Sequence, residues 1–429
     1  MNDAIILLFS IFFGLILLNV PITFCLIVST IATTTYMGIP VVVVFQRMAQ
    51  GVESFSFLAI PFFILAGEIM GAGGISNRLV AFADVLVGRF RGGLAQVNIM
   101  ASTFFGGISG SPAADVSSVG AILIPMMERQ GYDKDFAVNV TVTSACQSMI
   151  IPPSHNMIIY AMAAGGVSAG RLFLAGVVPG ILLGLCLMAI TYVITVQRAY
   201  PKGKRYTFGD AAKISRDAIL GIFTIVIILL GVTFGLFTAT ESAAMACAYA
   251  FFVTFFVYRE IGIREMIPII SRTLRTLSIV LAIIAAANGF CWVLSFLKVP
   301  EMVTSGLLTL SENRIVLLLL INLMLLILGC IMDVAPLIVI TTPILLPVAM
   351  QIGMSPVHFG IMLLMNLAIG ACTPPVGSVL FAGCAVGKIS IEKLLRGIIP
   401  FYAAMLAALL IVTFFSDVVM FLPDYLMPE

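Results

Sequence analysis

The chain has 429 residues, of which 61% are hydrophobic and only 10% are charged, and its net charge at neutral pH is +2. Soluble domains carry about 25% charged residues, so this composition requires lipid as a solvent and leaves no soluble domain of useful length. The small and dispersed net charge argues against nucleic acid as a partner, and any soluble partner must be another chain.

Apolar stretches of about 20 residues, the length that spans a bilayer, recur along the chain and predict an all-α polytopic membrane protein rather than a barrel. The first stretch follows an N-terminus without basic residues and has no obvious cleavage site, which indicates a retained helix. The eight cysteines lie in apolar runs without a CxxC pair, so we expect packed side chains and no transition-metal site. The clearest stretches are residues 4–20, 218–237, 243–257 and 315–331.

Two breaks interrupt the apolar pattern of the first half. A glycine-rich segment, residues 106–115, separates two apolar stretches that are too short to cross the membrane separately. We expect residues 94–127 to form a re-entrant helical hairpin with its tip inside the membrane. Pro152 and Pro153 donate no N–H, so the helix predicted over residues 135–166 must open there and restart.

The longest polar interruption, residues 198–216, holds six basic residues against one acid, Asp210. The positive-inside rule predicts that this loop is cytoplasmic. The ends of the chain are acidic instead, so we expect both termini outside the cytoplasm. The acids near the ends are Asp3, Asp417, Asp424 and Glu429, and no basic residue follows Arg396.

The sequence matches itself at an offset of 222 residues, and the matches concentrate on glycine and proline. Gly107 meets Gly329, and Pro152-Pro153 meets Pro374-Pro375. Shared glycines and prolines indicate shared backbone geometry better than shared leucines would. Since both termini are expected outside and the middle inside, each half crosses the membrane an odd number of times, and the second repeat is inverted relative to the first.

The predicted organisation therefore consists of two inverted repeats, each with one hairpin and one broken helix. The first repeat is 1–197, with the hairpin 94–127 and the broken helix 135–166; the cytoplasmic basic loop is 198–216; the second repeat is 217–429, with the hairpin 315–350 and the broken helix 357–387.

In inverted-repeat transporters, solutes and coupling ions bind where helices are broken near the middle of the membrane. Carbonyl groups freed at the hairpin tips and breaks can hold a desolvated Na⁺, and the N–H groups that open the next half-helix face an anion. The expected sodium-binding residues are Gly107, Ser109, Gly110, Ile151, Pro152, Gly329, Met332, Asp333, Thr373 and Pro374.

The polar residues at the breaks differ between the halves, as an asymmetric solute requires. Ser111 corresponds to Asp333, and Ser154-His155-Asn156 corresponds to Val376-Gly377-Ser378. A carboxylate at membrane depth costs about 2.5 to 3.5 kcal/mol, which makes Asp333 the strongest candidate, as a partner of a cation or of a substrate hydroxyl; a helix-capping role shares the same geometry. The expected substrate-binding residues are Ser109, Ser111, Ser154, His155, Asn156 and Asp333.

The two break motifs, their spacing, and the segments 61–67 and 237–244 resemble the large membrane subunit of tripartite ATP-independent periplasmic (TRAP) transporters over essentially the whole chain. The resemblance implies a sodium-driven importer of organic acids in the bacterial inner membrane, with Na⁺ as the coupling ion and no cofactor. It also implies a small four-helix membrane subunit, a periplasmic substrate-binding protein, and an elevator mechanism. The transport domain would then comprise residues 94–170 and 313–390, and the scaffold the rest.

His155-Asn156 and Asp333 resemble the sialic acid branch of that family, whereas dicarboxylate-type members usually carry an apolar pair and a glutamate there. We therefore expect N-acetylneuraminate in preference to a C4-dicarboxylate. A stand-alone ion-coupled anion transporter of the same superfold is a further alternative. A membrane enzyme is disfavoured, because the sequence carries neither an HExxH nor a Walker motif and Ser154 and His155 are adjacent on one helix start.

Overall fold

The computed structural model describes residues 2–53, 55–311 and 313–428; the predicted acidic residue Glu429 lies outside these ranges. Regular structure within them is helical, apart from one antiparallel bridge between Arg91 and Lys202. Helices up to residue 197 are α1 (Asn2–Leu17), α2 (Ile22–Tyr36), α3 (Val41–Gln50), η1 (Phe55–Leu58), α4 (Ala59–Ala72), α5 (Ile75–Val87), α6 (Gly93–Ser109), α7 (Pro112–Asp115), η2 (Val116–Gly120), α8 (Ala121–Arg129), α9 (Lys134–Ala145), η3 (Cys146–Met149), α10 (His155–Ala163) and α11 (Ala169–Gln197). The later helices are α12 (Phe208–Thr233), α13 (Ala239–Phe252), η4 (Val253–Val257), α14 (Ile263–Phe296), α15 (Val299–Leu310), α16 (Arg314–Ile331), α17 (Val334–Gln351), α18 (Pro356–Ala371), α19 (Ser378–Gly387), α20 (Ile391–Phe414) and α21 (Ser416–Leu426).

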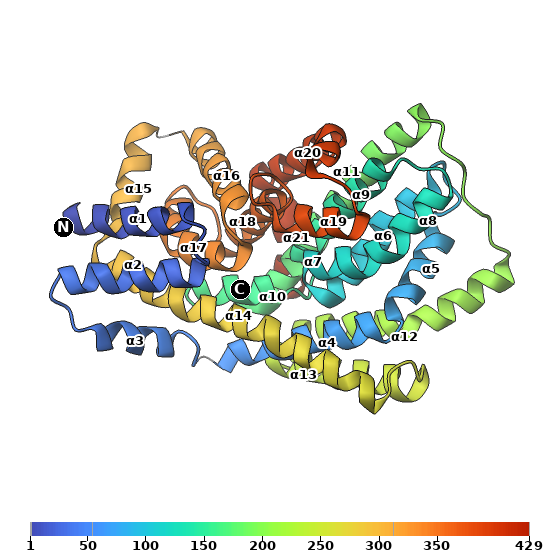
Figure 1. Cartoon of the computed structure of the whole chain (residues 1–429), viewed down its shortest axis with the longest axis horizontal. Helices are drawn as coiled ribbons and strands as arrows, with labels where there is room; N and C mark the ends of the chain where they lie inside the picture. The colour runs from blue at the N-terminus through green and yellow to red at the C-terminus, as the bar shows by residue number, and fades with distance from the viewer. Residues whose placement is uncertain (1, 54, 312, 429) are drawn as a thin grey trace.

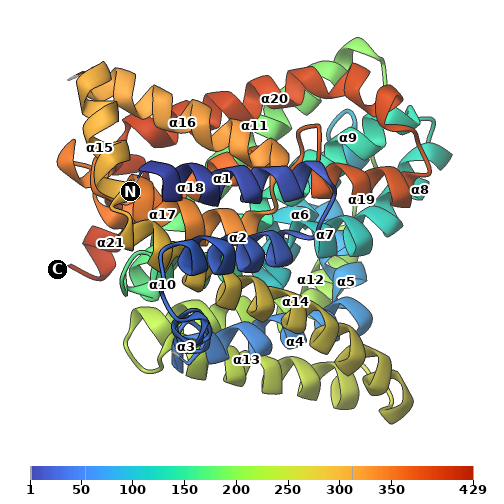
Figure 2. The ribbon, with the colours of Figure 1, turned by 60° about the vertical axis from the view of Figure 1, so that its left-hand side comes forward.

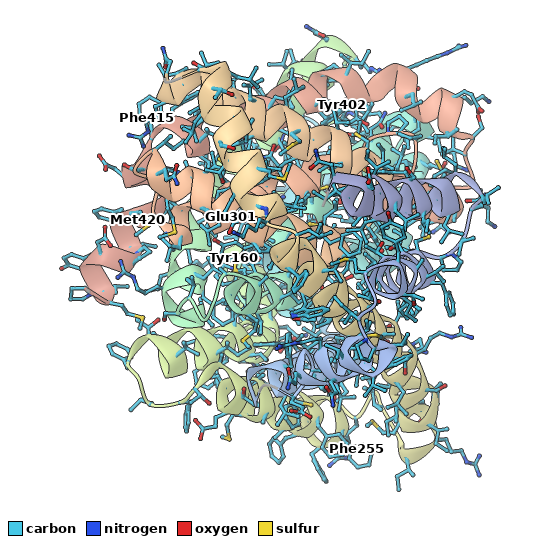
Figure 3. All side chains as sticks on the ribbon, turned by 90° about the vertical axis from the view of Figure 1, so that its left-hand side faces the viewer. Tyr160, Phe255, Glu301, Tyr402, Phe415 and Met420 are labelled. Carbon is cyan, nitrogen blue, oxygen red and sulfur yellow. The ribbon has the colours of Figure 1, made fainter. Side chains whose placement is uncertain are left out.

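Seven of the described helical segments are long and apolar enough to cross a membrane: α11, α12, α13 with η4, α14, α16, α17 and α20. The pair α4–α5, bent by 72°, would be an eighth span. Large apolar side chains are also exposed over the surface, among them Leu17, Ile263 and Phe415, and Figure 3 shows Phe255 and Phe415 at its outer edges. Such a surface is stable only against lipid, which confirms the prediction of an all-α polytopic membrane protein.

The order of helices in the first half recurs in the second. Helices α6, α7, α9, α10 and α11 begin at residues 93, 112, 134, 155 and 169, and α16 to α20 begin at residues 314, 334, 356, 378 and 391, which is 221 to 223 residues later. The Pro152–Pro153 and Pro374–Pro375 peptide bonds are both cis.

The recurring helices of the two halves pack into one another at the centre of the molecule. Helix α10 packs on α17, and α19 packs on η2 and α9. Two hydrogen bonds link the broken segments directly: the Cys146 thiol donates to the Ala368 carbonyl at 3.1 Å, and the Tyr160 hydroxyl donates to the Pro356 carbonyl at 2.5 Å. Figure 3 shows Tyr160 in the middle of the molecule.

Helices α4, α13 and α14 form an outer wall beside this centre. Helix α13 packs along α4, and α14 packs against α2, α3, α4 and α17. In Figure 1, α14 runs across the lower part of the molecule. In Figure 2, α13 and α20 lie on opposite sides, with the broken helices between them.

The basic interruption is shorter than the loop predicted over residues 198–216. Residues 208–216 form the first turns of α12, because the Thr207 hydroxyl accepts the Asp210 N–H at 3.3 Å and caps the helix. The remaining loop is held against the helices by the Arg198–Asp133 ion pair at 2.8 Å. The Tyr206 hydroxyl donates to Asp84 at 2.5 Å, and burial together with this carboxylate raises the pKa of Tyr206 to about 12.

Candidate functional site

A cavity of about 560 Å³ lies between the wall helices α4 and α14, the segment from α6 to η2, and the first residue of α10. Its volume falls within the range of clefts that bind small molecules. The polar residues that line it are Glu68, Ser109, Ser111, Ser117, Ser118, His155, Arg272 and Thr276.

The turn between α6 and α7 is tied to the start of α10. Helix α6 ends at Ser109, and Gly110 reverses the chain at a φ of +59°, a conformation that side-chain-bearing residues rarely adopt. Ser111 caps α7 by accepting the Ala114 N–H at 3.4 Å, and its own N–H donates to the Ser109 hydroxyl at 3.3 Å. The Asn156 amide donates to the Gly110 carbonyl at 3.3 Å, so the turn and the restarted helix are held together.

The first break brings unpaired polar groups to the same place. Helix η3 ends at Met149, and α10 begins at His155 after the two prolines. Gly107 lies against this break, since a Cβ at Gly107 would be 2.9 Å from the Pro152 carbonyl oxygen. Within the described residues, the buried Ser154 hydroxyl and the His155 Nδ1 have no hydrogen-bond partner. Buried polar atoms are normally paired. His155 lines the cavity, so its ring nitrogen is available to a ligand, whereas Ser154 is fully buried and does not line the cavity.

The second turn, between α16 and α17, has a different character. Asp333 is exposed there, and its carboxylate accepts the Ser378 hydroxyl at 3.2 Å. The Val376 N–H donates to the Cys330 carbonyl at 2.9 Å, which ties the second Pro-Pro segment to this turn. Met332 is buried and lines a separate, apolar cavity of about 380 Å³.

The predicted site residues therefore form two groups. Asp333 does not line the 560 Å³ cavity. Its hydrogen-bond partner Ser378 begins α19, and α19 packs on α7, so the group around Asp333 is connected to the group around the first break. The first group comprises Gly107, Ser109, Gly110, Ser111, Ile151, Pro152, Ser154, His155 and Asn156. The second comprises Gly329, Met332, Asp333, Thr373 and Pro374.

Two features of the cavity wall are absent from the sequence prediction. Glu68 of α4 and Arg272 of α14 form an ion pair at 2.8 Å on the cavity wall. Glu68 is the only acid in the apolar segment Ala59–Ala72, and an isolated carboxylate in such a segment is itself a functional indication. Nothing in the sequence shows that residues 68 and 272 meet, because they are 204 positions apart.

Comparisons with known proteins identify the chain's relatives. Residues 9–418 match the family described as the tripartite ATP-independent periplasmic transporter, DctM component. The chain is 41% identical over 428 residues to the uncharacterized protein YgiK of Salmonella typhimurium, covering 99% of this chain and 98% of the relative. It is 37% identical to the sialic acid TRAP transporter large permease protein SiaM of Vibrio cholerae, covering 96% of each chain. It is 33% identical to the C4-dicarboxylate TRAP transporter large permease protein DctM of Rhodobacter capsulatus, covering 98% and 99%.

A solved structure shares the fold. The YdaH transporter of Alcanivorax borkumensis superposes with a TM-score of 0.63 at 14% sequence identity, covering 86% of this chain and 87% of that one. Its likeness shows the fold of a membrane transporter and no more, because identity is this low. The family match over most of the chain and the full-length relatives show that this chain belongs to the DctM family of TRAP transporter large permease subunits, and is a multi-pass membrane transport protein and not an enzyme.

Proposed function

We propose that this chain is the membrane transport subunit of a sodium-coupled importer of an organic acid, with N-acetylneuraminate as the first candidate substrate. The observation that carries the proposal is the 560 Å³ cavity, which joins one guanidinium group to several hydroxyls and to an unpaired imidazole nitrogen. A carboxylate and a hydroxyl-bearing body are the groups that such a lining recognises.

The carboxylate of the substrate would bind Arg272. The Arg272 guanidinium is held by Glu68, and its side chain is half-exposed. A guanidinium group can bind a carboxylate through two parallel hydrogen bonds, so a substrate carboxylate would compete with Glu68 for Arg272. Ser109, Ser111 and His155, which line the cavity, would then contact the hydroxyl and amide groups of the substrate, with Asn156 holding the turn in place.

The number of cationic side chains that line the cavity favours a monocarboxylate as the substrate. Among the described residues that line it, Arg272 is the only lysine or arginine. A sialic acid carries one carboxylate and many neutral polar groups, which matches one guanidinium and a row of hydroxyls. A C4-dicarboxylate would need a second cationic partner; it remains the second candidate because the Rhodobacter capsulatus relative is named for that substrate.

Sodium would bind at the two turns. The carbonyl and hydroxyl oxygens of the predicted sodium-binding residues are hard ligands of the kind that Na⁺ requires, and Asp333 would complete the second turn. The transport domain, residues 94–170 and 313–390, would move as an elevator and slide against the wall of α4, α13 and α14. The cavity lies between these two parts, so it would open to different sides as they slide.

The complete transporter would include a small four-helix membrane subunit and a periplasmic binding protein, in the bacterial inner membrane, with both termini in the periplasm. The test is uptake into proteoliposomes that hold this chain with its small subunit. Sialic acid uptake should require both a sodium gradient and the binding protein. Uptake that persisted without a sodium gradient would overturn sodium coupling, and uptake that persisted without the binding protein would overturn the need for that partner. Uptake of C4-dicarboxylates but not of sialic acids, from a panel of both classes, would overturn the proposed substrate.

A further inference from the structure

Asp115 is a carboxylate buried inside the first half without a partner. Its side chain is 1% exposed, and neither carboxylate oxygen has a hydrogen bond among the described residues. The Ser102 hydroxyl of α6 is its polar neighbour and also shares a hydrogen bond of 3.1 Å with the Ser144 hydroxyl. The Cys146 thiol at the start of η3 is a second electrostatic neighbour. An uncompensated carboxylate in such surroundings costs several kcal/mol, so it must be neutralised.

No basic side chain among the described residues performs that neutralisation. None of the ion pairs recorded in the structure includes Asp115. Helix α6 carries no charged residue, and the arginine of α5, Arg78, is paired with Glu260. The titratable groups on the other elements that pack against α7 and η2 are Glu128 and Arg129 of α8, Lys134 and Asp135 of α9, Cys146 of η3, Asp84 of α5 and Cys384 of α19.

The fold itself does not require a carboxylate at this position. The residue 222 positions later is Leu337, which occupies the first turn of α17 and is 1% exposed. The polar neighbour also changes, since Ser102 corresponds to Met324. A second difference lies beside Asp115: residues 116–120 form a π-helical turn, whereas α17 continues as a regular α-helix. Such turns often accompany functional sites.

We propose that Asp115 is a binding site for one monovalent cation, Na⁺ or H⁺, which neutralises the carboxylate with the help of the Ser102 hydroxyl. Both occupants supply the single positive charge that a buried carboxylate needs. The site is distinct from the sodium ligands expected at the two turns. The role of Asp115 as a coupling-ion site rests on the proposed ion-driven transport. Cation binding to Asp115 can be measured separately, because binding does not require that the protein transports a substrate.

The test measures cation-dependent stability in the purified chain, reconstituted in nanodiscs with its small subunit. A cation that binds the folded state raises the midpoint of thermal unfolding. The Na⁺ arm titrates NaCl against choline chloride at pH 8; the H⁺ arm lowers the pH from 8 to 5 without sodium. The parent chain should gain stability in one arm, and Asp115→Asn, which is neutral and of similar shape, should lose that gain. The arm in which the gain is lost identifies the cation.

Two further variants complete the design. Asp417→Asn, at an exposed position of α21, is the matched control and should respond as the parent does. If Asp115→Asn fails to fold, Ser102→Ala replaces it and should raise the half-saturating cation concentration roughly tenfold, the value of one charge-assisted hydrogen bond. Unchanged responses in both arms for the folded variants would overturn the inference. Loss of the response in a chain that shows no sodium-dependent uptake would instead overturn the proposed function and leave the Asp115 site standing.

Discussion

Glu68 and Arg272 are separated by 204 residues in sequence and meet at 2.8 Å on the wall of the cavity. If Arg272 binds the substrate carboxylate, Arg272→Gln should raise the KM for uptake about 10- to 100-fold, because a charge-assisted hydrogen bond contributes about 1.5 to 3 kcal/mol. Uptake kinetics in proteoliposomes measure this. Arg264→Gln, at an exposed position earlier on the same helix, is the control. An unchanged KM for the Arg272 variant would remove the guanidinium group from the binding site.

Asp333 differs from the other substrate candidates, because it is exposed at the second turn and bonded to Ser378. As a sodium or substrate ligand it should be indispensable, so Asp333→Ala should abolish or strongly weaken uptake while the complex remains folded. Ser378→Ala, which removes only the hydrogen-bond donor, should reduce uptake by a smaller factor. Initial uptake rates, with size-exclusion profiles as the folding check, decide the matter; full activity of Asp333→Ala would place the site elsewhere.

At the scale of single residues, the sequence predicts where the helix breaks fall better than it predicts which side chains contact each other. The glycine and proline motifs indicate where the breaks fall, and the structure gathers Gly107, Pro152 and Asn156 around one of them. The Glu68–Arg272 pair depends on how α4 packs against α14, which no local pattern encodes. Asp115 lies within a glycine-rich motif that draws attention to its backbone, and only its burial shows that the side chain matters.

At the scale of helices, the crossing of α16 and α18 depends on two glycines in contact. A Cβ at Gly370 would lie 2.6 Å from the Gly329 backbone, which cannot move as a flexible side chain can. Gly370→Ala should therefore lower the free energy of unfolding by about 1 to 3 kcal/mol, the usual cost of overpacking. Gly306→Ala in α15, where a Cβ meets nothing within 4 Å, is the control. Thermal unfolding in detergent should show a lower midpoint for the first variant and an equal or higher one for the second.

Helix α21 is attached to α11 by an ion pair that is buried on one side. The Arg171 side chain is 10% exposed and binds Asp424 at 2.6 Å, and Ser355 and Met420 add a second link between α21 and α18. Figure 3 shows Met420 toward the edge of the molecule. Asp424→Asn should loosen α21 and cost about 1 kcal/mol, since the carboxylate itself is largely exposed. Glu128→Gln breaks the exposed pair with Lys134 and should have almost no effect. Limited proteolysis of the C-terminal segment compares them; equal cleavage rates would mean that the pair does not hold α21.

At the scale of the whole molecule, the sequence indicates the membrane class and the recurrence of the helices, because both follow from patterns spread over many residues. Helix starts that recur after 221 to 223 residues agree with the offset of 222, which is read mainly from glycines and prolines. The start of α12 at Phe208 differs from the predicted loop end at residue 216, because the capping Thr207 extends the helix into a basic run that resembles a loop. The packing of α10 on α17 and of α19 on η2 is a tertiary property that the offset does not contain.

The orientation in the membrane is the whole-molecule prediction that most directly supports two inverted repeats. The loop that begins at Arg198 should face the cytoplasm and α21 the periplasm, since basic residues gather in the first and acids in the second. A membrane-impermeant maleimide should label Ser416→Cys in intact spheroplasts, and Lys204→Cys only in inverted vesicles. Both positions are exposed, whereas the eight native cysteines are buried or half-buried, so the parent chain serves as the unlabelled control. Labelling of Lys204→Cys from the periplasm, with Ser416→Cys labelled only in inverted vesicles, would reverse the orientation. Labelling of both positions from the same side would mean that the chain crosses the membrane an even number of times between them. That result would remove the basis for an inverted second half.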